Sequence, residues 1–242
     1  MKLGRVAHYV IALVVAGLVP GLSGSAAFAQ DEPANMPASR LKTPFVEANT
    51  DRARKYMKDF AKCVYRRKPE RSEKLLRYSD NASINYSAVG FERDEIETKL
   101  SLSSCAGDVM DGRQESVVVR ISPLSLRNHL AEEAYLSHNA SALVIAESDD
   151  EVLSNRYETL TATDKTRFRA AFADCVVYHA VREADALIRT SVATDEERQA
   201  VKALVPALSQ CLTDGQEMEL TVKTIRGLAA DGLWSRTQDR LK

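Results

Sequence analysis

The side chains best suited to chemistry in this 242-residue sequence are four cysteines and a few histidines with acidic neighbours. His129, Glu132 and Glu133 stand three and four residues apart, so one face of a helix would present an imidazole and a carboxylate. Such a pair can ligate a metal or transfer a proton, as in a small metal-dependent or hydrolytic enzyme. A solvated polar helix face explains the same spacing, and we favour it. We therefore expect no catalytic residue, no metal and no cofactor.

The other histidines fit structural roles. His138 follows the helix that carries His129, and we expect it to help cap the last carbonyls of that helix. His179 shares a predicted helix face with Cys175 and is expected to pack at the edge of the core. The sequence contains no glycine-rich phosphate loop, no serine elbow and no pair of cysteines or histidines at metal-binding spacing.

The overall charge excludes one class of partner. Thirty-three Lys and Arg face 34 Asp and Glu, a net charge of −1, which disfavours nucleic-acid binding through bulk positive charge. The first predicted helices differ from this average, because their basic residues are Arg52, Arg54, Lys55, Lys58, Lys62, Arg66, Arg67, Lys68, Arg71 and Lys74. Such a basic face can meet an acidic surface or an envelope protein, although a solvated face explains it too.

The N-terminus predicts export. A short basic start, an apolar run and Ala27-Phe28-Ala29 are typical of a signal peptide over residues 1–29, cleaved before Gln30. The apolar run is too short for a membrane span, so no transmembrane segment is expected after cleavage. We expect a periplasmic or secreted protein, in a compartment that favours disulfides. Residues 30–50 are proline-containing and aperiodic and predict a flexible leader.

An internal repeat organises the remainder. Phe60-Ala61-Lys62-Cys63-Val64 matches Phe172-Ala173-Asp174-Cys175-Val176, an offset of 112 residues. A second cysteine and an Asp-Gly pair follow in each copy. The predicted helices at 126–133 and 225–231 then match if the second copy has a deletion of one residue. With this alignment His129 has no counterpart, and Ala230 is equivalent to Glu132. The pattern predicts repeat 1 at 51–138, a connector at 139–161 and repeat 2 at 162–242.

Arm lengths suggest how the cysteines pair. Helical arms 175–191 and 194–211 have nearly equal length, as do arms 63–78 and 90–105, so the two sulfurs of each copy meet at the open end of a hairpin. This favours Cys63–Cys105 and Cys175–Cys211. The pairing Cys63–Cys175 with Cys105–Cys211 also respects the repeat and stays open.

Local signals add detail to a mainly α fold of two tandem disulfide-pinned helical-hairpin repeats, with a short extended stretch in each. Thr163 is expected to cap one helix, and Thr194 with Glu197 to form a capping box. Pro69 and Pro206 predict kinks or breaks. The extended stretches are predicted at 115–122 and 218–222, where the two can pair, and the connector is expected to be helical near 151–160. Trp234 is expected to dock the last helix into the core.

Arginines recur at equivalent places. Arg127 and Arg226 begin the matched helices, while Arg77 and Arg189 end another matched pair. Contact with an anion or a peptide carboxylate would make Arg127 and Arg226 binding residues. Salt bridging or carbonyl capping at helix ends is the alternative, and we favour it.

The signal peptide, the Phe-x-x-Cys helices and the blocks Leu126-Arg127-Asn128-His129-Leu130-Ala131-Glu132-Glu133 and Ile225-Arg226-Gly227-Leu228-Ala229-Ala230-Asp231 resemble small exported four-cysteine proteins of sphingomonad-type alphaproteobacteria. The resemblance implies export and a repeat fold, and it carries over no activity or catalytic residue. The sequence therefore predicts an exported, non-enzymatic interaction or envelope-associated protein, with an enzyme using His129 and Glu132 or Glu133 as the alternative.

Overall fold

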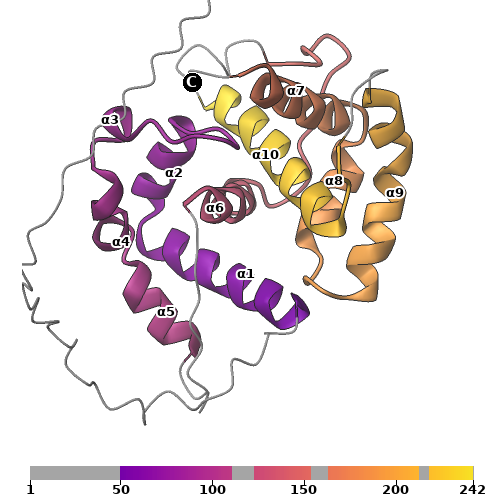
Figure 1. Ribbon diagram of the computed structural model, residues 1–242. Coiled ribbons are helices and arrows are strands. Elements are labelled where there is room, and N and C mark those ends of the chain that lie inside the picture. Colours follow the sequence, from indigo (N-terminus) through magenta and orange to yellow (C-terminus); the bar gives the residue numbers. More distant parts are fainter. Residues whose placement is uncertain (1–49, 111–122, 154–162, 213–217, 242) are drawn as a thin grey trace, which may run out of the picture. The chain divides into compact units, whose positions relative to one another are not determined.

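The computed structural model describes residues 50–110, 123–153, 163–212 and 218–241 (Figure 1). These residues belong to the compact unit Glu47–Lys242. Their regular structure is helical, and the β-type pairing among them is one isolated bridge between Ser79 and Ile84. The mainly α class is confirmed. The predicted signal peptide, nearly all of the leader and the predicted strand 115–122 lie outside the described residues.

The helices follow one another in two groups, each closed by a long helix. The first group comprises α1 (Thr50–Arg67), α2 (Pro69–Arg77), α3 (Tyr86–Val89), the 3₁₀ helix η2 (Arg93–Glu95), α4 (Ile96–Lys99), α5 (Leu102–Met110) and α6 (Pro123–His138). The second group comprises α7 (Asp164–His179), α8 (Val181–Arg189), α9 (Asp195–Cys211) and α10 (Val222–Arg240).

A single residue separates the first two helices of each group. Lys68 separates α1 from α2 with φ −138° and ψ 57°, and Pro69 starts the new helix because a first-turn position requires no N–H donor. The break predicted at Pro69 is confirmed. Ala180 separates α7 from α8 with φ −143° and ψ 49°, although no proline stands there.

The second arms differ between the groups. Helix α9 runs from Asp195 through Pro206 to Cys211 without ending at the proline. The predicted arm 90–105, by contrast, is wrong as one helix, because it consists of η2, α4 and α5. Gly90 has φ 81° and ends α3, and Ser101 has φ 57° between α4 and α5, so neither position continues a right-handed helix.

Helix capping follows the local sequence. The Thr163 hydroxyl accepts a hydrogen bond from the Thr166 N–H and starts α7, as predicted. The Thr194 hydroxyl accepts from the Glu197 N–H, but the Glu197 carboxylate accepts from the Ala193 N–H instead of from Thr194. The capping box at α9 is therefore formed on one side only.

The closing helices hold the groups together. Helix α6 packs on α1 and α2, α10 packs on α7, α8 and α9, and α6 and α10 pack on each other (Figure 1). Trp234 of α10 is fully buried, which confirms its predicted place in the core. The largest fully buried side chains also include Phe60, Phe172 and Leu130, one each from α1, α7 and α6. The apolar residues that recur every three or four positions on each helix thus pack against those of the neighbouring helices and form the core.

Two disulfides join helices, one within each group. Cys63 on α1 is bonded to Cys105 on α5, and Cys175 on α7 is bonded to Cys211 at the end of α9, with Cα–Cα distances of 5.6 and 5.9 Å. This is the pairing that the arm lengths favour. Each bridge encloses about 40 residues, a loop size for which the chain-entropy model gives a stabilisation of about 4 kcal/mol.

Two further predictions fail. Residues 218–221 form no strand, and the Thr221 hydroxyl instead caps α10 by accepting a hydrogen bond from the Thr224 N–H. The connector is not helical at 151–153, and its predicted continuation lies outside the described residues. Among the residues that the structure describes, no helix combines the length and apolar character needed to cross a membrane.

Candidate functional site

The candidate residues His129, Glu132 and Glu133 lie on α6, where α6 faces α1 and α10. Glu132 is only 2% exposed and accepts two hydrogen bonds from the Arg226 guanidinium, 3.0 Å to Nε and 2.7 Å to Nη2. This bidentate geometry is the strongest form of an arginine–carboxylate contact. Glu132 is therefore held by a partner 94 residues away and is not presented to solvent.

Arg226 is engaged through every guanidinium nitrogen. Besides Glu132, its N–H groups donate to the carbonyls of Leu187, Ile188 and Thr190 at 2.9–3.0 Å and to Glu197 at 3.1 Å. These carbonyls lie at the C-terminal end of α8, where a helix leaves acceptors without intrahelical donors. The donors of Arg226 are therefore used inside the fold.

Cations from α1 complete the cluster. Lys58 forms ion pairs with both Glu132 and Glu133, and Arg54 forms one with Glu197 at 2.5 Å. Three carboxylates are thereby matched by Arg54, Lys58 and Arg226. Since buried charges are stable only when paired, this balance explains how α1, α6, α9 and α10 can meet at charged residues.

The environment moves the pKa values of this cluster in different directions. Burial alone would raise the pKa of Glu132, but hydrogen bonds and charge from Arg226 and Lys58 outweigh it and lower that pKa. Burial prevails at Glu133 and raises its pKa despite Lys58. Burial also lowers the pKa of His129 to about 4, against the attraction of Glu132. His129 is thus neutral at pH 7, and the carboxylates that would act with it are committed to cations.

We expect acid to destabilise the protein partly through His129. Its pKa is about 4 in the folded state and about 6.5 when unfolded, so the unfolded chain takes up a proton between these values and stability falls as the pH falls. Allowing for partial exposure, the loss between pH 7 and 5 is about 1–2 kcal/mol. Urea unfolding at both pH values, followed by circular dichroism, measures it.

His129→Gln is the control for that prediction, because it removes the titration and keeps a polar side chain. The variant is expected to lose less stability than the wild type between pH 7 and 5. The raised pKa of Glu133 acts in the opposite direction in both proteins and so cancels in the comparison. Equal losses in the two proteins, or an NMR titration of His129 near pH 6.5, would contradict the assignment.

Arg127 forms the counterpart of the Arg226 contact. It is 3% exposed, its Nη1 lies 2.7 Å from Oδ1 of Asp231 on α10, and its Nε donates to the Ser79 hydroxyl at 3.1 Å. The Ser79 carbonyl, just beyond α2, accepts from Nη2 at 3.3 Å. Arg127 thus joins α6 to α10 and to the end of α2, just as Arg226 joins α10 to α6 and to the end of α8, and both arginines form buried ion pairs.

The remaining sequence candidates have local partners. His138 contacts Glu73 at 2.9 Å and the Trp234 ring, so the predicted capping role is wrong, and Asn139 caps α6 by donating to the Tyr135 carbonyl. Arg189 pairs with Asp185 one helical turn earlier and donates to the Asn139 carbonyl. His179 is partly exposed beside Glu151, next to the Cys175–Cys211 disulfide.

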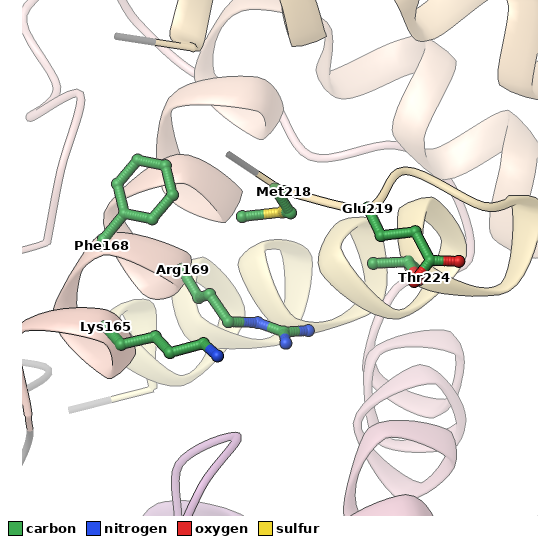
Figure 2. A pocket seen from close by; sticks show the side chains of 6 residues that line it. All are labelled: Lys165, Phe168, Arg169, Met218, Glu219 and Thr224. Carbon is green, nitrogen blue, oxygen red and sulfur yellow. The ribbon is translucent and has the colours of Figure 1, made fainter. Parts of the chain in front are cut away.

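A cavity of about 270 Å³ lies between α7 and the start of α10. Its lining, shown in Figure 2, consists of Lys165, Phe168, Arg169, Met218, Glu219 and Thr224. Arg169 extends from α7 toward Glu219 and Thr224 (Figure 2). Two cations and one carboxylate line the cavity beside the apolar side chains of Phe168 and Met218.

The exposed side of α1 carries a concentration of positive charge. Residues 50–77 contain eleven Lys and Arg and four Asp and Glu, a net charge of +7, whereas the corresponding residues 164–189 have a net charge of +1. Arg52, Lys55, Lys62 and Arg66 are exposed and recur at helical spacing, with Asp59 among them. We call these four cations the basic face of α1. Lys58, which lies at the edge of this face, forms ion pairs with Glu132 and Glu133 and belongs to the buried cluster.

Sequence reasoning missed Lys58, Glu197 and Asp231 as partners in the buried ion pairs. One signal was present, since the spacing of five residues from Arg127 to Glu132 recurs from Arg226 to Asp231 once the deletion is omitted.

Comparison of the chain with protein-family models, curated proteins and solved structures finds no match.

Proposed function

We propose that this chain is an exported, non-enzymatic envelope-associated protein that binds an anionic phospholipid surface through the basic face of α1. The observation that carries the proposal is the row of exposed cations Arg52, Lys55, Lys62 and Arg66 along one helix. From residue 52 to residue 66 this row extends about 21 Å at 1.5 Å per residue. Several lipid headgroups fit along that length.

A membrane surface fits this face better than a protein partner does. Protein interfaces gain most of their binding energy from buried aromatic, apolar and arginine anchors. The exposed large hydrophobic side chains among the described residues are Val144, Val152, Val205, Leu212, Leu220 and Leu241, and none belongs to α1 or α2. Without apolar anchors, attraction rests on charge, as for basic segments that adsorb on anionic lipids.

A non-enzymatic role is supported by the state of the candidate catalytic residues. Glu132 and Glu133 are paired with Lys58, and Glu132 also with Arg226, so neither carboxylate is available to substrate. His129 has a pKa of about 4, too low for an efficient general base near neutrality. These contacts give the cluster a structural role.

Export rests on the sequence of residues 1–29, and the disulfides support it. Cys63–Cys105 and Cys175–Cys211 leave no free cysteine, as is usual in oxidising compartments. We propose cleavage before Gln30 and a periplasmic or secreted location. The N-terminal sequence of protein recovered from outside the cytoplasm tests both.

We further propose that residues 51–138 and 162–242 are tandem repeats, as in the exported four-cysteine proteins that the sequence resembles. Helices α2 and α8 both have nine residues, lie 112 positions apart, and follow breaks of similar backbone geometry at Lys68 and Ala180. An alignment of α6 with α10 without a deletion makes Arg127 equivalent to Arg226 and Glu132 equivalent to Asp231. In the ion pairs Arg127–Asp231 and Arg226–Glu132, the arginine of each repeat thus contacts the carboxylate of the other repeat. This reciprocal pairing supports a pseudo-two-fold axis between the repeats.

Vesicle co-sedimentation tests the proposed surface. We expect binding to vesicles of phosphatidylcholine with phosphatidylglycerol, none to phosphatidylcholine alone, and release at high salt as charges are screened. Lys55→Gln/Lys62→Gln/Arg66→Gln should weaken binding at least about tenfold, since each basic residue near an anionic surface contributes about 1 kcal/mol. The three positions are exposed, so the fold should be retained.

The matched control removes the same charge elsewhere. Lys165, Arg182 and Lys202 are exposed on α7, α8 and α9, and their replacement by Gln should leave vesicle binding within about twofold of wild type. Equal weakening by both triple variants would contradict a site on α1. Salt-resistant binding to a single envelope protein, without binding to vesicles, would replace the lipid proposal with a protein partner.

A further inference from the structure

One group of metal-ligating side chains lies outside the buried ion pairs. Glu151, Cys175, His179 and Cys211 each place one donor atom within 4.8 Å of the others, and they come from the connector, α7 and α9. It is the one such group that gathers within the described part of the chain. The sulfurs are bonded to each other in the structure, so the four side chains do not act as a ligand set in this oxidised form.

We propose that reduction of the Cys175–Cys211 disulfide creates a zinc site whose ligands are the two thiolates, the His179 imidazole and the Glu151 carboxylate. Two thiolates with one imidazole and one carboxylate are a ligand set that Zn²⁺ accepts in tetrahedral geometry. This inference is independent of the proposed membrane surface, because it concerns the opposite hairpin and a different chemistry.

The geometry needs little rearrangement. Cys175 and His179 stand four residues apart, so they lie on one face of α7. In a tetrahedral site with Zn–S bonds of about 2.3 Å, two sulfurs are about 3.8 Å apart. The Cα–Cα distance of 5.9 Å between Cys175 and Cys211 accommodates that separation by side-chain rotation.

The two other ligands are already close to each other. The His179 Nε2 lies 3.3 Å from Oε1 of Glu151, and the Gln210 amide contacts the same ring. Arg236 of α10 donates to the Glu151 carbonyl at 2.7 Å and to the Asp150 carbonyl at 3.0 Å, which fixes the connector beside α7. Contacts of this kind orient metal ligands in known sites.

The chemistry balances with a dithiol reductant. Its first thiolate attacks one sulfur of the disulfide and forms a mixed disulfide, and its second thiolate displaces the protein thiol, so two electrons pass to the protein and the reductant becomes a disulfide. Zn²⁺ then replaces one proton on each of the two thiols, and an imidazole nitrogen of His179 and a carboxylate oxygen of Glu151 complete the ligand set. The reduced, metal-bound form is thus more stable at higher pH.

The other disulfide is an internal comparison. Cys63 Sγ lies 3.8 Å from the Asp108 carboxylate, which is paired with Arg67, and no histidine joins this pair in the described structure. Two thiolates without an imidazole bind Zn²⁺ more weakly, so only the second hairpin is expected to hold the metal tightly.

Metal titration of the folded chain tests the proposal. The protein is treated with a phosphine reductant and titrated with Zn²⁺ against a chromophoric chelator, and with Co²⁺ to record thiolate-to-cobalt absorption and the bands of a tetrahedral ion. We expect one equivalent bound by the reduced wild type and none by the oxidised protein. Cys63→Ser/Cys105→Ser should bind as the wild type does, and His179→Ala should bind at least about tenfold more weakly.

Several results would overturn the zinc site. They are no tight binding by the reduced wild type, unchanged affinity in His179→Ala, and one tight equivalent in Cys175→Ser/Cys211→Ser. Circular dichroism covers the case in which reduction unfolds the chain. Recovery of helicity on adding Zn²⁺ to the wild type, but not to His179→Ala, supports the site, and no recovery in either protein rejects it.

Discussion

Replacing Arg226 by Met is expected to lower the free energy of unfolding by about 3–5 kcal/mol, the cost of removing one partner from a buried ion pair. Glu132 and Glu197 are 2% and 1% exposed, and the substitution removes the bidentate contact of the first and the Arg226 contact of the second. The carbonyls of Leu187, Ile188 and Thr190 each lose a hydrogen bond from Arg226 as well. Urea unfolding followed by circular dichroism gives the difference.

Two variants make the Arg226 result specific. Arg226→Lys keeps the charge but cannot form the bidentate contact or reach the same carbonyls, so it should recover only part of the loss. Arg198→Met breaks an exposed pair with Asp195 and should change stability by less than about 1 kcal/mol. If Arg226→Met were as mild as Arg198→Met, the buried cluster would not stabilise the fold as described.

Gly232→Ala is the second substitution with a large expected effect, a loss of at least about 3 kcal/mol from overpacking. A Cβ atom at Gly232 would lie 2.5 Å from the Ala173 carbonyl oxygen and 2.8 Å from Cγ2 of Val177. The first of these is backbone of α7 and cannot rotate away. Helices α7 and α10 must therefore move apart, which also disturbs the packing of the buried Trp234 two residues later.

Gly227→Ala on the same helix is the matched control. Its added Cβ would meet Asn128 at 3.8 Å, an ordinary van der Waals contact, and alanine favours a helix over glycine by about 0.5–1 kcal/mol. We expect a small gain in thermal midpoint for Gly227→Ala and a large loss for Gly232→Ala. Similar behaviour of the two variants would mean that α7 and α10 do not pack this closely.

The sequence was sufficient for features that depend on nearby residues. The caps at Thr163 and Thr194 and the break at Pro69 depend on hydroxyl groups and a ring within one helical turn. Their outcome is therefore fixed locally. The helical class follows from apolar spacing, because a stripe at three- and four-residue intervals can be buried only by a helix.

The candidate site could not be predicted from the sequence, because its contacts join distant segments. His129, Glu132 and Glu133 have the spacing of an exposed polar face, and nothing near them in the chain shows that Arg226 and Lys58 cover two of them. The short helices in place of arm 90–105 depend on the positive φ values at Gly90 and Ser101. A glycine permits that conformation without requiring it, and a serine rarely adopts it.

The partner exchange between α6 and α10 has a consequence for biosynthesis. A ribosome releases the chain from its N-terminus, so Arg127 and Glu132 exist for some time before Asp231 and Arg226 are made. Until α10 arrives, α6 holds an arginine and a carboxylate that lack these partners, and α7 exposes the surface that Gly232 later covers. Nascent chains interrupted before α10 should therefore remain protease-sensitive, whereas chains that include α10 should become resistant.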